Sequence, residues 1–418
     1  MASSTPPLPS EIIFKILSRT SLETLDTCKA VKKEWHDMIF ESSFMPQFCA
    51  NSQNISGYFV QGPSNSSYYA SEFVSMDGCS GNSTTTTPFH LPRPDELVNS
   101  PAFSFSTRIV ASTMQGILCC VITRGNRRRR YHICKPSTKQ WVKLPNPRTR
   151  YLTQKVALIV LRSKPLHFKI IRLSSPPASQ PYHYSKLGLI THYRCEIFDS
   201  EYWRWRQGKD ILLLYPKYSF FHPFAPAVHA AGLIYFHLCD GQVMALNYDG
   251  EEVFPKFSLP NCPGIDDKYT DDHRLIMEYK GKLGCTCLSP NGIMLWVFDN
   301  GRRDWELIIK EVDIEIIKGE AKYAIPHGFY NADIVLMAED NRVFFYKLQD
   351  KSFNLVTLKK CHGFLEFFPF RSDLEPMDIR MPGANIVSST KHRYRPSWIS
   401  FVIVFIFLFG IILLFSHA

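Results

Sequence analysis

The chain has 418 residues, of which 45% are hydrophobic and 21% are charged, and its formal net charge is +10. This length exceeds what one small core needs, and the composition allows most of the chain to be buried in folded domains. The basic residues are scattered along the sequence, so the positive charge does not indicate a nucleic-acid partner, and we expect none. No apolar run follows Met1 and no Cys-x-x-Cys pair occurs, so we expect no signal peptide, free thiols and no metal site.

The N-terminal part has the pattern of a small helical module. Residues 1–7 are small and rich in proline, and we expect them to be disordered. Within residues 8–48, apolar side chains recur at helical spacing in three short runs that begin near Ile12, Leu22 and Val31. Pro9 suits the first turn of the first helix. Three such helices bury little apolar surface alone, so the module is either a cap on a larger domain or a docking element.

After Pro46 the apolar pattern changes to period two, which indicates short β-strands separated by turns. In four places an aromatic residue follows an apolar position by seven residues, across a polar turn. These pairs are Cys134 and Trp141, Phe198 and Trp205, Phe298 and Trp305, and Tyr346 and Phe353. Each pair predicts a β-hairpin whose second strand adds one ring to the core. Such repetition favours a β-propeller, with a β-sandwich as the alternative, and places Trp141, Trp205 and Trp305 in the propeller core.

Sequence motifs of enzymes are absent. We find no glycine-rich nucleotide loop, no nucleophile elbow and no zinc-protease helix motif, and the 14 histidines do not cluster at ligand spacing. We therefore predict no catalytic residue, cofactor or metal. His222 and His229 flank a proline-rich turn and are expected at loop or edge positions. The arginines at 127–130 are expected at a solvated hairpin tip, with contact to an acidic target as the alternative.

The C-terminal part differs in composition from the rest. Residues 363–397 contain several prolines and little periodicity, so we interpret them as a linker, although their first phenylalanines could complete a blade. The run from Trp398 to Phe415 carries no charge and as a helix spans roughly 27 Å, enough for a bilayer core. It predicts a single transmembrane helix, with a buried core element of the propeller as the alternative. Lys391, Arg393 and Arg395 precede it, so the N-terminal domains should face the cytosol, with the endoplasmic reticulum as the first candidate membrane.

The helical module closely resembles the F-box motif. The resemblance rests on Leu8-Pro9-x-Glu11-Ile12, Ile16-Leu17-Ser18-Arg19, Leu25, Cys28-Lys29-x-Val31 and Trp35. It departs from the family at Thr20-Ser21, where Leu-Pro is usual. The resemblance implies a three-helix F-box at residues 8–48 that docks a Skp-type adaptor. The residues that it assigns to this contact are Leu8, Pro9, Ile12, Ile13, Ile16 and Leu25.

The segment from Tyr131 to Trp141, with Cys134, Pro136 and Thr138 in between, is similar to the signature of the plant F-box-associated domain, which is kelch-like. This resemblance implies a mainly β fold with a kelch-like β-propeller at residues 55–362. It also implies a non-enzymatic subunit of an SCF-type ubiquitin ligase that binds a target protein and, through the Skp-type adaptor, a cullin. A membrane scaffold that acts without a cullin and a propeller enzyme are the alternatives.

Overall fold

A computed structural model describes residues 8–20, 22–41, 44, 47–48, 55–64, 69–75, 106–124, 128–176, 182–185, 188–215, 220–262, 274–289, 292–312, 324–349, 351–372 and 375–380. The predictions for residues 1–7, for most of the linker and for the run from Trp398 to Phe415 concern residues outside these ranges. Within these ranges, no helix has the length and apolar character that a membrane crossing requires.

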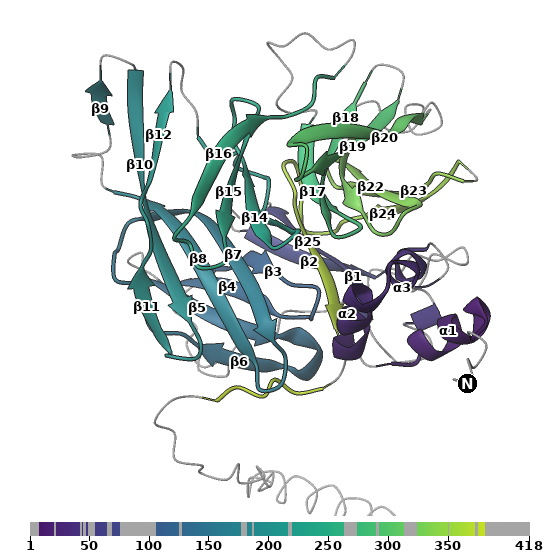
Figure 1. Cartoon of the computed structure of the whole chain (residues 1–418). Coiled ribbons are helices and arrows are strands. Elements are labelled where there is room, and N and C mark those ends of the chain that lie inside the picture. Colours follow the sequence, from purple (N-terminus) through teal and green to yellow (C-terminus); the bar gives the residue numbers. More distant parts are fainter. Residues whose placement is uncertain are drawn as a thin grey trace, which may run out of the picture. The chain divides into compact units, whose positions relative to one another are not determined.

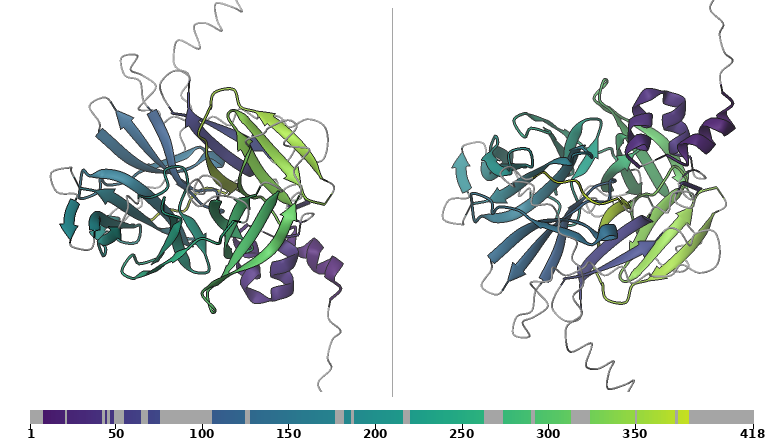
Figure 2. Two further views of the ribbon diagram at one scale, coloured as in Figure 1. Left: turned by 90° about the horizontal axis from the view of Figure 1, so that it is seen from above. Right: turned by 90° about the horizontal axis from the view of Figure 1, so that it is seen from below.

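The strands form six antiparallel sheets among the described residues, and these sheets are arranged around a central axis as the blades of a propeller (Figure 2). The predicted β-propeller is therefore confirmed. Blade 1 consists of β25 (Glu366–Ser372), β1 (Ile55–Pro63) and β2 (Tyr69–Ser75), and blade 2 of β3 (Ser106–Ser112), β4 (Leu118–Arg124), β5 (Arg128–Lys135) and β6 (Gln140–Lys143). Blade 3 consists of β7 (Leu152–Arg162), β8 (His167–Ser175), β10 (Gly188–Asp199) and β11 (Arg204–Gln207), and β9 (Tyr182–Ser185) and β12 (Ile211–Tyr215) pair with the first half of β10.

The other three blades have four strands each. Blade 4 consists of β13 (Val228–Ala230), β14 (Leu233–His237), β15 (Gln242–Asn247) and β16 (Val253–Ser258). Blade 5 consists of β17 (Arg274–Tyr279), β18 (Lys282–Leu288), β19 (Ile293–Asp299) and β20 (Asp304–Val312). Blade 6 consists of β21 (Ile325–Phe329), β22 (Ile334–Glu339), β23 (Arg342–Lys347) and β24 (Ser352–Thr357).

The ring is closed by a strand from each end of the propeller sequence. β25 pairs antiparallel with β1, with Phe368 opposite Phe59, so the last strand completes the first blade. The predicted domain end at residue 362 is therefore wrong, and the propeller extends to residue 372. The sequence Phe367-Phe368-Pro369-Phe370 has no two-residue alternation, which is why this strand resembles a linker. Its proline is tolerated on a strand that lies at the end of its sheet.

The seven-residue repeat corresponds to one structural position. The register places Cys134 opposite Trp141, Phe198 opposite Trp205, Phe298 opposite Trp305 and Tyr346 opposite Phe353, always across the last two strands of a blade. Trp205 is 5% exposed, whereas Trp141 and Trp305 are half-buried and pack against the edges of core clusters. The tryptophans therefore close the hydrophobic core near the outer edge of their blades.

Two cysteines lie next to each other in the structure. Cys262 and Cys287 have their Cα atoms 6.2 Å apart, a separation that a disulfide can span. Cys287 lies on β18 and Cys262 lies on the connection that follows β16. The other described cysteines are not in disulfide bonds.

Three helices precede the propeller in the chain: α1 (Ser10–Leu17), α2 (Leu22–Val31) and α3 (Lys33–Ile39) (Figure 1). They pack against blades 1 and 6. The shared hydrophobic cluster contains Leu17, Leu25 and Ile39 from the helices together with Tyr58 from β1 and Leu336 from β22. The end of the module is also bonded to the propeller, because the backbone N–H of Ala332 donates to the carbonyl oxygen of Phe40 at 3.3 Å. The helices are thus a cap on the propeller.

Candidate functional site

The outer face of α1 is apolar and exposed. The exposed fractions are 60% for Leu8, 40% for Ile12 and 52% for Ile16, and Pro9 is exposed as well. Ile12 and Ile16 are four residues apart in α1, so they lie along one side of the helix, and Leu8 lies just before its N-terminus. Three large aliphatic side chains on an eight-residue helix and its N-terminal flank form a stripe that no described residue covers. We call Leu8, Pro9, Ile12 and Ile16 the α1 stripe.

The opposite face of α1 holds the module together. Ile13 and Phe14 pack against the cluster that the helices share with the propeller, and the rings of Phe14 and Phe44 lie 5.2 Å apart, edge to face. Leu25 is 1% exposed and belongs to the same cluster. Of the six residues expected to contact an adaptor, four form the α1 stripe, Ile13 is half-buried and Leu25 is buried. We assign Leu25 to packing of the module, because its side chain has no free surface.

A second feature is a cavity of about 510 Å³ at the centre of the propeller. The first strands of the blades provide most of its wall, and the helical module contributes Lys29 and Ala30 of α2, His36 of α3 and Phe40, which follows α3. The wall is mainly apolar, with aromatic side chains from β21 and β25. Its ionisable groups include Arg371, Glu278, His229 and His327.

Burial decides the charge of the two cavity histidines. It lowers the pKa of His229 to about 4. Burial, with a smaller contribution from His222, lowers the pKa of His327 to about 3. Both imidazoles are therefore neutral at pH 7, and each can donate one hydrogen bond and accept another. His229 lies on β13, the strand at the inner edge of the blade 4 sheet, so its expected loop or edge position is confirmed.

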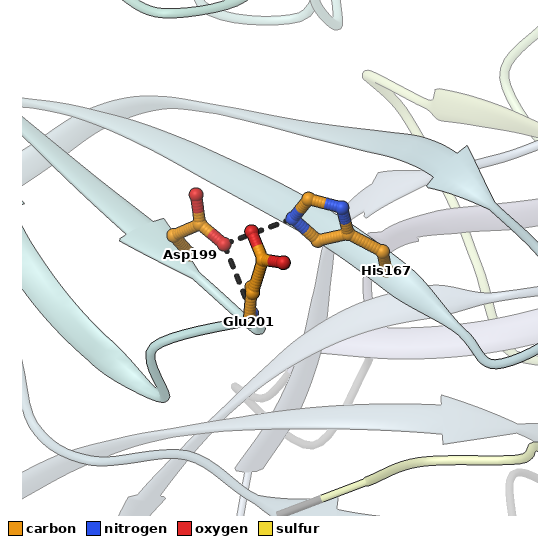
Figure 3. A group of neighbouring side chains, drawn as sticks. All are labelled: His167, Asp199 and Glu201. Carbon is orange, nitrogen blue, oxygen red and sulfur yellow. Dashed lines mark hydrogen bonds and ion pairs between the residues drawn. The ribbon is translucent and has the colours of Figure 1, made fainter. Parts of the chain in front are cut away.

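A third group of ionisable side chains lies at the hairpin between β10 and β11 (Figure 3). Asp199 Oδ1 lies 2.9 Å from His167 Nε2 and accepts the backbone N–H of Glu201 at 2.9 Å. Asp299 occupies the equivalent position in blade 5 and accepts the backbone N–H groups of Gly301 and Arg302, without a neighbouring histidine. The aspartate therefore caps this type of hairpin, and we assign no ligand to the group in blade 3.

Three of the four arginines of the run fall on the first part of a strand. Arg128, Arg129 and Arg130 begin β5 and pair with β4, so within the described residues they are strand residues and not the hairpin tip. Sequence reasoning also missed Arg371 and His327 as central residues. No short motif could have indicated them, because the cavity wall combines positions from all six blades, far apart in the sequence.

Comparison with known proteins agrees with this architecture. Residues 79–370 match the family described as F-box associated beta propeller domain. The chain is 27% identical over 172 residues to F-box protein At5g41720 of Arabidopsis thaliana, which covers 40% of this chain and 87% of that protein. It is 24% identical over 351 residues to F-box protein At5g49610 of the same species, covering 82% of this chain and 89% of that protein.

Among solved structures, TolB from Acinetobacter baumannii aligns with a TM-score of 0.38 and 10% identity, over 76% of this chain and 66% of TolB. The family match covers most of the propeller, and β1 and β2 of blade 1 precede it in the sequence. The chain therefore belongs to the family of the F-box associated beta propeller domain.

Proposed function

We propose that this protein is the substrate-recognition adaptor of an SCF-type ubiquitin ligase. In this proposal the helices α1–α3 are an F-box, the α1 stripe docks a Skp-type adaptor that brings a cullin, and the propeller binds a target protein. The observation that carries the proposal is the exposed α1 stripe on a module whose other face is fixed to a propeller of this family. An apolar stripe of this kind gains stability when a partner removes it from water.

The mechanism requires no bond chemistry from this chain. The propeller holds a target while the F-box holds the ligase, so the target lysines and the ubiquitin-charged enzyme meet at a high effective concentration. The packing of the helices against the propeller supports this mechanism, because a direct contact limits the volume that the target explores. The coupling consists of the shared cluster around Leu17, Leu25 and Tyr58.

The docking surface can be tested with Ile16→Asp. The substitution places a charge in an apolar contact, and hot-spot substitutions of this kind cost about 2–4 kcal/mol of binding free energy. Binding of the purified chain to a Skp-type adaptor, measured by calorimetry, should fall by at least about thirtyfold. Leu212→Asp is the matched control, because Leu212 is 67% exposed on β12 and lies outside the helical module. It should bind like the unmodified chain.

An Ile16→Asp variant that is folded and binds the adaptor with unchanged affinity would refute the docking assignment. A second experiment separates a ligase from a scaffold that acts without a cullin. Affinity purification of the full chain from plant cells should recover a cullin together with the Skp-type adaptor. Recovery of the adaptor without any cullin would favour the scaffold.

We further propose that the run from Trp398 to Phe415 anchors the protein in a membrane by its tail, with the helices and propeller in the cytosol. The support is its length, its lack of charge and the basic residues before it. An N-terminally tagged full chain should fractionate with membranes and resist alkaline carbonate. A chain that lacks residues 397–418 should be released. Carbonate extraction of the full chain would refute the anchor.

A further inference from the structure

The central cavity has the size and character of a small-molecule site. Its volume of about 510 Å³ falls within the range of roughly 300–1,000 Å³ that is usual for ligand pockets. Apolar side chains such as Val156, Leu275 and Phe367 provide much of the wall. Neither docking of an adaptor to the α1 stripe nor binding of a target protein requires such a cavity.

One cation in the wall lacks a counter-ion. Arg371 is 6% exposed and lies on β25, and its Nη2 donates to the carbonyl oxygen of Tyr330 at 3.2 Å. Its guanidinium carbon lies 5.7 Å from the centre of the Tyr330 ring. Within the described part of the chain, its Nε has no hydrogen-bond partner, and no carboxylate lies within ion-pair distance of it. A buried charge of this kind is costly unless an anion and further hydrogen bonds compensate it.

Glu278, a carboxyl group of the same wall, forms no ion pair with Arg371 within the described residues. Glu278 Oε1 accepts the backbone N–H of Gly281 at the turn after β17. His229 and His327 are neutral at pH 7 for the reason given above, so they add hydrogen-bonding capacity without charge. The cavity thus combines the buried guanidinium of Arg371 with mainly apolar walls, two neutral imidazoles, the carboxyl group of Glu278 and the amino group of Lys29.

We propose that the central cavity binds a small organic anion, whose acid group pairs with Arg371 and whose apolar body packs between the first strands of the blades. An acid group accepts two parallel N–H bonds from a guanidinium, which the free Nε of Arg371 allows. Residues of α2 and α3 also line the cavity, so the bound anion would contact both the helical module and the propeller.

The test uses the full-length protein and two fluorescent probes of similar shape. These are 8-anilinonaphthalene-1-sulfonate, which is an anion, and N-phenyl-1-naphthylamine, which is uncharged. Both should bind the unmodified chain with a stoichiometry of about one. Arg371→Met should lower the affinity for the anionic probe by at least about tenfold, which is the equivalent of one charge-assisted hydrogen bond. The affinity for the uncharged probe should change by less than about twofold, because this probe forms no ion pair with Arg371.

Gly328→Phe closes the cavity by a different route. A Cβ added at Gly328 meets only Tyr58 Oη, at 4.0 Å, so the new ring can enter the open space without a clash at its base. This variant should lose both probes. Arg302→Met is the control, because Arg302 is exposed on the hairpin between β19 and β20, and it should bind both probes normally.

Thermal unfolding would establish that each variant is folded. If Arg371→Met does not fold, Arg371→Lys takes its place; it keeps the charge but cannot make the two parallel N–H bonds, so it should weaken binding of the anionic probe and leave binding of the uncharged probe unchanged. Equal affinity of the anionic probe for the unmodified chain and for Arg371→Met would overturn the proposal. Normal probe binding by Gly328→Phe would also overturn it, since the probes would then bind elsewhere.

Discussion

At the scale of single residues, the repeated tryptophans differ in how their indole N–H groups are satisfied. Trp205 Nε1 donates to the carbonyl oxygen of Pro145, and Trp305 Nε1 donates to that of Ser258, each at 2.8 Å. Both acceptors lie at or just beyond the outer strand of the preceding blade. Trp141 is in blade 2, and blade 1 has only three described strands. Within the described residues, the buried Nε1 of Trp141 accordingly has no partner.

This difference predicts unequal effects of the same substitution. Trp205→Phe removes a hydrogen bond that joins two blades, so it should lower the free energy of unfolding by about 1 kcal/mol more than Trp141→Phe does. Trp205→Ala should cost about 3–5 kcal/mol, because it also leaves a cavity. Urea denaturation followed by circular dichroism measures these differences. Equal losses for the two Trp→Phe variants would show that the link between the blades contributes no net stability.

At the scale of the hairpins, the seven-residue spacing results from one turn geometry. Lys139, Trp203, Arg303 and Lys351 all have φ between 53° and 56°, and each lies two residues before the repeated ring. None of them is glycine or asparagine, the residues that favour this left-handed region. The sequence therefore predicted the spacing but could not indicate the turn. The same spacing recurs in blade 4 between Leu246 and Val253, where no aromatic residue marks it.

The left-handed positions predict where glycine stabilises the fold. The left-handed conformation at Lys351 costs about 1–2 kcal/mol for any residue other than glycine, and Lys351→Gly removes this cost. Glycine in turn loses more conformational entropy on folding, which opposes the gain by about 0.5–1 kcal/mol. The free energy of unfolding should therefore rise by about 0.5–1 kcal/mol. Glu306→Gly is the control, because Glu306 is exposed on β20 and pairs regularly with Val297, and it should be destabilising. A loss of stability in Lys351→Gly comparable to that of the control would contradict this account.

At the scale of the whole molecule, a feature could be predicted from the sequence only where the residues that form it lie close together in the sequence. The period-two runs and the spacing between Phe298 and Trp305 are local, so the strands, the hairpins and the repeating blades were predictable. The closing strand pairs with residues more than 300 positions earlier, and nothing local marks that partner. The cavity is even less local, because Arg371, His229 and His327 come from three different blades.

The closing strand predicts where the chain can be shortened. A chain that ends at residue 362 lacks β25, so β1 loses one of its two partner strands and Phe59 loses its contacts with the rings of Phe368 and Phe370. An open ring exposes unpaired strand edges and apolar surface, and this chain should aggregate or unfold without cooperativity.

A chain that ends at residue 380 retains β25 and the segment that follows it. That segment is fixed to blade 3, because the backbone N–H of Leu166 donates to the carbonyl oxygen of Asp378 at 2.7 Å. Met377 and Ile379 also pack into a cluster shared by blades 2 and 3. The chain ending at residue 380 should therefore unfold in one cooperative thermal transition, as measured by circular dichroism. A soluble and cooperatively folded chain that ends at residue 362 would contradict the closure of the ring by β25, since the propeller would then be complete without that strand.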